Sequence, residues 1–207
     1  MGKALEMTRW IKLLIRISKK IRLKIELSRY NNFTIAEYFR KQGAQIGEGC
    51  FFSIRNLGTE PYLVKIGNNV AVTSGVQFQT HDGGTWIFRE EIPHLRVYGP
   101  IVIEDNCLIG TNAQILPNVT IGKNSIVAAG SVVINDIPPD SIVMGVPARV
   151  FGSVSKYKEK CIERWKFQKP PNFNLDSVRH YDLLENSEEV LSQLKEHLKY
   201  VFRDKLM

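Results

Sequence analysis

The 207-residue sequence has few cysteines and lacks any apolar run long enough to cross a membrane. Cys50, Cys107 and Cys161 are odd in number and far apart, so their spacing matches neither a disulfide framework nor a zinc motif. The apolar residues near the N-terminus are interrupted by Lys and Arg, unlike the core of a signal peptide. We therefore expect a cytoplasmic protein, beginning near Met1, that binds no metal.

Most of the chain carries no excess of basic residues. Residues 1–30 hold nine Lys or Arg against two Glu, which accounts for the whole net charge of +7 and leaves the remainder neutral. A nucleic-acid-binding domain is expected to carry basic residues over its folded surface. We therefore expect no nucleic-acid partner, and the basic arm needs a separate explanation.

Apolar and basic residues interleave through residues 10–27 of this arm. The pattern partly fits a basic amphipathic helix, and from residue 21 to 27 it also fits the alternation of a strand. Two roles are open. The arm can attach the protein to an anionic membrane surface, such as the inner face of the membrane, with Trp10 at the interface. Alternatively, it packs on its own domain or on a neighbouring subunit.

A six-residue repeat dominates the middle of the chain. β-Branched residues recur at every sixth position: Ile103, Ile109, Ile115, Ile121, Val127 and Val133. Four positions after each comes a mostly small residue: Cys107, Ala113, Val119, Ser125, Ser131 and Ile137. A period of six matches no helical face. Three such hexapeptides predict one triangular coil, in which the aliphatic residue points inward and the small residues fit the corners.

The same pattern begins upstream at Ile46, with insertions at about residues 54–64 and 81–100. Long excursions from a solenoid are loops that often carry function. Residues 33–42 predict a short helix, capped by Asn32 or Thr34 and ended by Gly43, which covers the first coil.

Residues 153–168 and 187–203 predict two further helices after the repeat. The expected domains are a basic arm and capping helix in residues 1–43, a β-helix in residues 44–150 and a helical extension in residues 151–207.

The most specific motifs run from Ile109 to the segment around Arg149. They are Ile109-Gly110-Thr111-Asn112-Ala113, Pro117-Asn118-Val119-Thr120-Ile121-Gly122, Ala129-Gly130-Ser131-Val132-Val133, Asp136-Ile137-Pro138-Pro139-Asp140 and Gly145-Val146-Pro147-Ala148-Arg149-Val150. With them, residues 43–150 resemble the hexapeptide-repeat acyltransferases, which include galactoside, maltose and serine acetyltransferases and the capsule and lipopolysaccharide O-acetyltransferases. The resemblance implies a left-handed parallel β-helix, a homotrimer and acetyl-CoA bound between neighbouring subunits. The repeat period alone reveals neither the handedness nor the trimer.

His81 matches the catalytic histidine of that family, because it stands where the longer loop leaves the repeat. A sugar hydroxyl is a poor nucleophile at neutral pH, and an imidazole with an ordinary pKa near neutrality can remove its proton as it attacks a thioester. Asp82 or a backbone carbonyl is expected to orient the ring.

The resemblance also implies the residues that bind the substrates. For acetyl-CoA they are Thr111, Ala129, Ile134, Asn135 and Arg149, although relatives carry Thr and Lys where this chain has Ile134 and Asn135. Thr111 and Ala129 would equally serve as plain corner residues. For the acceptor, the loop offers Asp82, Trp86, Phe88 and Arg89, whose aromatic faces suit sugar rings and whose guanidinium suits a phosphate or carboxylate. The aromatic residues can instead anchor the loop on an adjacent subunit.

The function expected from these features is O-acetylation of a sugar, in a cell-surface polysaccharide or its precursor. N-acetylation of an amino sugar or xenobiotic is the main alternative. A zinc hydratase on such coils needs three His ligands, whereas the coil region holds only His81 and His94. A non-catalytic trimeric scaffold would not require a histidine at the loop.

Overall fold

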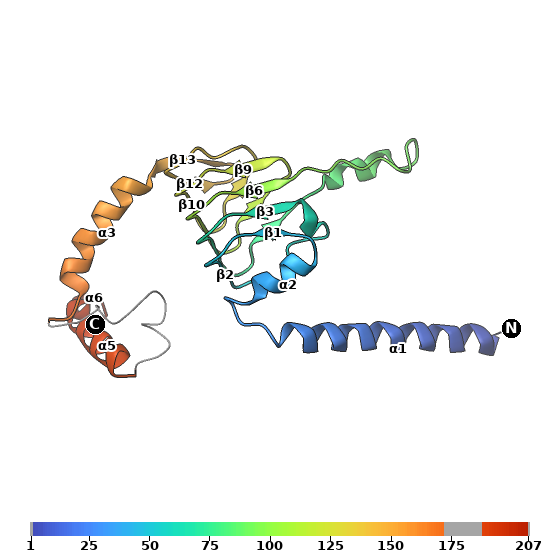
Figure 1. The fold of residues 1–207 in the computed structure, drawn as a ribbon, viewed down its shortest axis with the longest axis horizontal. Helices are drawn as coiled ribbons and strands as arrows, with labels where there is room; N and C mark the ends of the chain where they lie inside the picture. The colour runs from blue at the N-terminus through green and yellow to red at the C-terminus, as the bar shows by residue number, and fades with distance from the viewer. Residues whose placement is uncertain (1, 172–187, 207) are drawn as a thin grey trace. The chain divides into compact units, whose positions relative to one another are not determined.

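The repeat folds into three sheets that surround one interior (Figure 1). The structure, a computed structural model, describes residues 2–171 and 188–206. The sheets have the strand orders β1-β3-β6-β9, β2-β4-β7-β10-β12-β13 and β5-β8-β11. Their strands pair in parallel, except for the antiparallel pair β12 and β13. From β4 to β11 the chain visits the second, third and first sheets in turn, so the predicted triangular coil is confirmed as a parallel β-helix.

The strands are short, as flat faces between closely spaced corners must be. The first sheet contains β1 Gln45–Ile46, β3 Val64–Ile66, β6 Ile101–Ile103 and β9 Val119–Ile121. The second contains β2 Phe51–Phe52, β4 Ala71–Val72, β7 Leu108–Ile109, β10 Ile126–Val127, β12 Ser141–Gly145 and β13 Ala148–Ser153. The third contains β5 Gln77–Phe78, β8 Gln114–Ile115 and β11 Val132–Val133.

The aliphatic column predicted from the repeat forms the core. All six of its residues, from Ile103 to Val133, are at most 1% exposed. Parallel register places equivalent residues of successive coils above one another, as in the pairings of Ile66 with Ile103 and of Ile103 with Ile121. Such stacking removes apolar surface from water at about 25 cal/mol per Å².

A ladder of asparagines aligns one corner of successive coils. Asn69, Asn106 and Asn124 all have positive φ, between 53° and 58°, a left-handed conformation that asparagine tolerates better than most residues. The side-chain amide of Asn69 donates to Asn106 at 2.7 Å, and that of Asn106 donates to Asn124 at 2.9 Å. The ladder therefore combines the turn conformation with hydrogen bonds between coils.

Gly110 lies where two adjacent coils approach each other closely, and this predicts the effect of its replacement. A Cβ atom there would come within 2.5 Å of the Ala129 backbone nitrogen and 2.7 Å of the Val127 oxygen. Backbone cannot move aside cheaply, so Gly110→Ala is expected to lower the free energy of unfolding by about 1–3 kcal/mol in urea melts. Gly152→Ala is the matched control, because its Cβ would meet nothing within 4 Å. Equal losses in both variants would contradict this explanation.

The helix α2, Ile35–Lys41, covers the first coil. Its Phe39 is fully buried and packs edge-to-face on Phe52, with ring centroids 5.4 Å apart. Gly43 has the positive φ, 96°, expected at the end of this helix. Thr34, one of the two predicted caps, is the N-cap residue, but its side chain makes no capping hydrogen bond. The Asn31 side chain instead accepts from the backbone N–H groups of Phe33 and Thr34.

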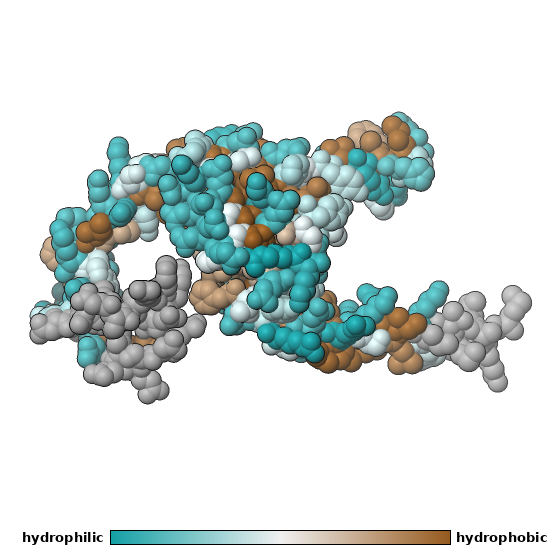
Figure 2. Space-filling model, viewed as in Figure 1, coloured by the Kyte–Doolittle hydropathy of each residue, from teal (hydrophilic) through white to brown (hydrophobic). Residues whose placement is uncertain are grey.

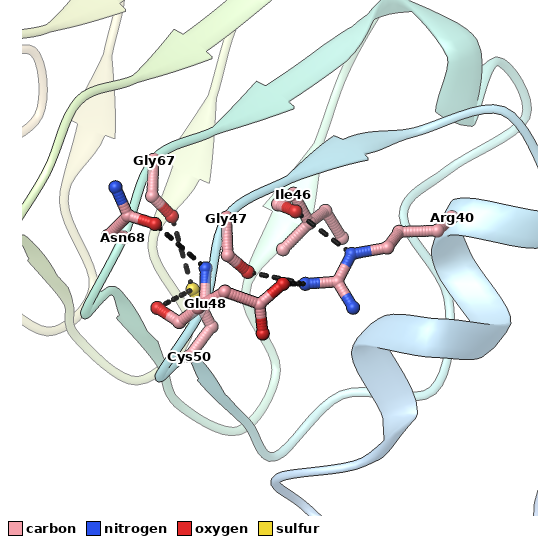
Figure 3. A network of polar contacts seen from close by, with 7 residues as sticks. All are labelled: Arg40, Ile46, Gly47, Glu48, Cys50, Gly67 and Asn68. Atoms are coloured by element: carbon pink, nitrogen blue, oxygen red, sulfur yellow. Dashed lines mark hydrogen bonds and ion pairs between the residues drawn. The ribbon is translucent and has the colours of Figure 1, made fainter.

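Arg40 of α2 binds open carbonyl groups of the first coil (Figure 3). Its guanidinium donates to the carbonyl oxygens of Ile46 at 2.9 Å and Gly47 at 2.6 Å, and to the Glu48 carboxylate at 2.9 Å. Figure 3 also shows Asn68 of the next coil accepting from the Glu48 backbone N–H. The backbone carbonyl groups at this end of the β-helix thus accept hydrogen bonds from a charged side chain rather than from another strand.

The basic arm is helical throughout its described length. Helix α1 extends over Gly2–Leu27, so the strand alternation considered for residues 21–27 is wrong. Among residues 10 and 12–27, whose side chains the structure describes, eight large apolar side chains, including Trp10, are exposed. Within residues 2–171 and 188–206, no helix combines the length and the apolar character that crossing a membrane requires.

The chain divides into two units, Met1–Val154 and Ser155–Met207. Helix α3, Val154–Gln168, agrees closely with the helix predicted for residues 153–168. The second unit also contains α5, Glu188–Val201, and α6, Arg203–Leu206. Ser187, the predicted start of the last helix, lies outside the described residues.

Candidate active site

His81 stands where the long loop leaves and re-enters the coils. It follows β5 by three residues, and an antiparallel bridge joins it to Tyr98. The backbone N–H of Gly99 donates to the Thr80 carbonyl at 2.9 Å, and that of Asp82 to the Val97 carbonyl at 2.9 Å. The base of the loop is therefore a short two-stranded ribbon that holds the backbone of His81. Its side chain is 43% exposed, which leaves the ring accessible to a substrate.

Glu60 is the partner of His81. Its Oε2 atom lies 3.0 Å from Nδ1 of His81 and accepts hydrogen bonds from the hydroxyls of Thr80 at 2.6 Å and Thr59 at 2.8 Å. Burial alone would raise the pKa of Glu60, but the hydrogen bonds from Thr80, His81 and Thr59 outweigh it, so the pKa is lowered. Glu60 is therefore a well-held carboxylate near neutral pH.

This contact determines which ring nitrogen of His81 can act as a base. An ionised carboxylate only accepts hydrogen bonds, so in the neutral imidazole Nδ1 carries the hydrogen and donates it to Glu60. Nε2 then keeps its lone pair. The arrangement can take a proton at Nε2 while the carboxylate of Glu60 stabilises the positive charge that forms on the ring.

Sequence reasoning missed Glu60 and expected Asp82 or a backbone carbonyl at the ring. Asp82 instead accepts from the Gly84 backbone N–H at 2.8 Å and caps the 3₁₀ helix η2, Gly83–Phe88. Glu60 lies in the shorter insertion, just before the 3₁₀ helix η1, Pro61–Leu63.

The shorter insertion occupies the place that a strand of the third sheet would take in the first coil. The third sheet begins only at β5, and Gly58 of the insertion fits so closely that a Cβ there would lie 2.7 Å from the Phe78 carbonyl oxygen. Residues 53–56, Gly58 and residues 75–79 also line one groove. The sequence signal that could have identified Glu60 as the partner of His81 was therefore a carboxylate in the insertion one coil before the histidine.

Trp86, Phe88 and Arg89, predicted to bind the acceptor, lie on the longer loop and are exposed. Trp86 is 65% and Phe88 45% exposed. The guanidinium carbon of Arg89 lies 3.9 Å from the centre of the Trp86 ring, a cation–π contact. The structure therefore joins Trp86 and Arg89 and leaves Phe88 exposed on the same loop.

Thr111 and Ala129, predicted to bind acetyl-CoA, lie at one corner of adjacent coils. Both are exposed, and the backbone N–H of Gly130 donates to the Thr111 carbonyl at 2.8 Å. The next coil continues this corner, because Ala128 donates to Val143, and Arg149 pairs with Met144 in the β12–β13 hairpin.

Ile134 and Asn135 lie at the opposite edge of the third sheet. They follow β11, whose Val133 pairs with Ile115, and Ile115 in turn pairs with Phe78. This register places them on the edge from which the chain continues to His81. The predicted cofactor residues therefore occupy both edges of one sheet rather than one cluster.

No group of three or more His, Cys, Asp or Glu side chains in the described part of the chain could hold a metal ion. The chemistry that the described residues support directly is proton transfer at His81, held by Glu60.

Comparisons with known proteins agree with the repeat fold. Residues 100–135 match the family model described as bacterial transferase hexapeptide (six repeats). The chain is 47% identical over 138 residues to Protein CapG of Staphylococcus aureus, covering 65% of this chain and 80% of that protein. It is 35% identical over 111 residues to galactoside O-acetyltransferase of Escherichia coli, covering 53% of this chain and 54% of that enzyme.

A solved structure is similar as well. The hexapeptide-repeat-containing acetyltransferase VCA0836 of Vibrio cholerae superposes with a TM-score of 0.50 at 30% identity, covering 66% of this chain and 89% of that one. The repeat, the buried columns and the extent of identity to CapG lead to one conclusion. The chain belongs to the hexapeptide-repeat acyltransferase family.

Proposed function

We propose that the protein transfers an acetyl group from acetyl-CoA to a sugar hydroxyl, with His81 as general base. The observation that carries the proposal is the contact of 3.0 Å between Nδ1 of His81 and Glu60, which leaves Nε2 free to accept a proton. The similarity to a galactoside O-acetyltransferase supports both the reaction and a sugar acceptor.

In the proposed reaction, Nε2 of His81 takes the proton of the acceptor hydroxyl while the oxygen attacks the thioester carbonyl. The new bond joins that oxygen to the acetyl carbon, and the bond from this carbon to sulfur breaks. The departing thiolate then receives the proton that Nε2 holds, so His81 returns to its starting state. General-base catalysis of this kind contributes about 10²- to 10⁴-fold.

Residues of the third sheet and its corners are proposed to hold acetyl-CoA. Thr111 and Ala129 are small and exposed at one corner, so an extended chain can approach the backbone there. Arg149 is exposed in the hairpin that continues this corner, where a guanidinium suits a phosphate. Ile134 and Asn135 would contact the other side of the bound molecule.

The proposal includes a left-handed winding of the coils and a homotrimer, in which a neighbouring subunit completes each site. The exposed aromatic residues of the longer loop, Trp86 and Phe88, support a surface that meets either the acceptor or an adjacent subunit. With Asp82 fixing the start of η2 and Arg89 stacked on Trp86, this loop is the proposed acceptor-binding element.

The proposed acceptor is a cell-surface polysaccharide or its precursor, and the proposed setting is the cytoplasm. Cys50, Cys107 and Cys161 are free thiols, as a reducing compartment favours. Burial raises the pKa of Cys50 and Cys107, which makes both poor nucleophiles.

Release of free CoA tests the proposal. The purified protein is incubated with acetyl-CoA and a panel of sugars, nucleotide sugars and aminoglycosides. We expect release above the background hydrolysis rate with hydroxyl acceptors that carry no amine, and an ester product that dilute base cleaves. Turnover restricted to amines would replace O-acetylation by N-acetylation, and no turnover with any acceptor class would leave a non-catalytic trimer as the better explanation.

A further inference from the structure

One face of helix α1 carries a stripe of exposed apolar side chains. The stripe consists of residues spaced three or four apart, which share one side of a helix. They are Trp10, Leu14, Ile17, Ile21 and Ile25, with exposed fractions of 61%, 63%, 44%, 54% and 55%. Scattered apolar residues on a surface need no explanation, but a contiguous row along one helix marks a binding surface.

Basic side chains occupy the rest of this helix. Lys12, Arg16 and Lys19 lie on the face opposite the stripe, and Lys20, Arg22 and Lys24 lie along its two borders. All six are exposed. Figure 2 shows the resulting apolar and hydrophilic surfaces side by side along α1. The partner of this helix must therefore accept apolar contact and positive charge together.

The protein's own domain is not the partner of the stripe. The contact to the domain is made by another side of the helix, where Leu23 and Leu27 line a groove with Tyr30 and Arg55. Leu27 and Tyr30 also pack against the core. This side is turned roughly half a turn away from Leu14 and Ile25, at about 100° per residue.

A second copy of the helix fits the stripe poorly. The spacing of a coiled coil, continued from Trp10, Leu14, Ile17 and Ile21, would place Lys24 and then Ser28 on the seam. The stripe continues instead at Ile25, which keeps the period of a single straight helix. A bundle of copies would also leave the basic face without a complementary charge.

We infer that α1 lies in the plane of an anionic lipid surface. The apolar stripe enters the boundary between head groups and acyl chains, and the basic side chains along its borders, Lys20, Arg22 and Lys24, contact lipid phosphates. The long stems of Lys20 and Lys24 can extend from the border of the stripe to the head groups. At 1.5 Å per residue, the stripe from Trp10 to Ile25 offers roughly 23 Å of contact. The proposed acceptor class then narrows to glycans carried at a membrane, a step that rests on the proposed function.

Flotation with vesicles tests the inference on the full-length protein. We expect co-flotation with phosphatidylglycerol–phosphatidylcholine vesicles, little with phosphatidylcholine alone, and a loss of binding as salt is raised. Each basic residue near an anionic surface is worth about fivefold in the partition coefficient. The triple variant Lys20→Gln, Arg22→Gln, Lys24→Gln, which removes the basic side chains that border the stripe, is therefore expected to bind about 100-fold more weakly.

A matched pair of single variants tests the contribution of the apolar stripe separately from that of the basic side chains. Ile21→Gln removes a stripe residue and is expected to lower the partition coefficient at least about tenfold, whereas Ile15→Gln replaces an equally exposed isoleucine off the stripe and should change it much less. Circular dichroism checks that both variants keep the helix. Equal binding by the pair, or no binding to anionic vesicles, would overturn the inference. So would an altered oligomeric state of Ile21→Gln without vesicle binding, because the stripe would then bind a second copy.

Vesicle binding requires no acetyl transfer, so the inference and the proposed function can fail separately. The Ile21→Gln variant is expected to release CoA with a soluble acceptor at the wild-type rate. Loss of that soluble activity in a folded variant would contradict an exclusively membrane-binding role for α1.

Discussion

Replacement of His81 by alanine is expected to lower kcat for acetyl transfer by about 10²- to 10⁴-fold, with little change in stability. The imidazole is the group placed to take the hydroxyl proton, because its Nδ1 is bound to Glu60 and its Nε2 keeps a lone pair. The side chain is 43% exposed, so its removal leaves no buried cavity. Initial rates of CoA release measure the effect, and thermal melts check the fold.

The control for this prediction is His94→Ala. His94 is exposed on the same loop, so its replacement tests for a general disturbance of that loop. We expect at most a few-fold change. An H81A protein that binds acetyl-CoA and still turns it over at the wild-type rate would contradict the role of His81 as base.

The coils were predictable because their pattern is local and repeated. A buried residue at every sixth position, as from Ile103 to Val133, permits only one short strand per repeat, and stacking in register follows from the regular spacing. Short-range signals also gave the ends of α2 within two residues, since Gly43 supplies the positive φ that ends it. The hydrogen bonds that Asn31 accepts at the start of α2 were not predicted, because several neighbouring polar residues could have served as the cap.

The local sequence predicted the structure of the arm and of the active site less well than that of the coils. Residues 21–27 satisfy the periods of both helix and strand, and only the continuity of α1 through Leu27 decides between them. His81 was identifiable by its place at the break in the repeat. Its partner was not, because Glu60 is 21 positions earlier and reaches the ring through the stacking of two insertions. Asp82, the sequence neighbour of His81, was the poorer prediction for the residue that contacts the ring, because adjacent side chains point in different directions.

Glu60→Gln is expected to lower kcat by about 10- to 10³-fold while KM changes little, because the side chain acts through His81 rather than on the substrate. Glutamine keeps the size of the side chain but loses its charge. Its amide can also donate to Nδ1, which would place the ring hydrogen on Nε2 and block the base. Glu48→Gln is the matched control, since it removes an exposed carboxylate that pairs with Arg40 in the first coil.

The pattern of kinetic change separates this positioning role from a merely structural one. A positioning role lowers kcat in E60Q and leaves KM nearly unchanged. An unchanged kcat together with a reduced melting temperature would show that Glu60 only supports the fold.

Stability should depend on pH through the same carboxylate, with a definite sign. The pKa of Glu60 is lowered from its ordinary value of 4.5 in the folded protein, so its ionised form is stabilised by folding. That contribution is fully present above the ordinary value and is lost as pH falls through the lowered pKa. The difference in melting temperature between wild type and E60Q should therefore be largest near neutral pH and shrink below about pH 4.5. A difference that grows on acidification would reverse the sign and contradict the ionised state assigned to Glu60.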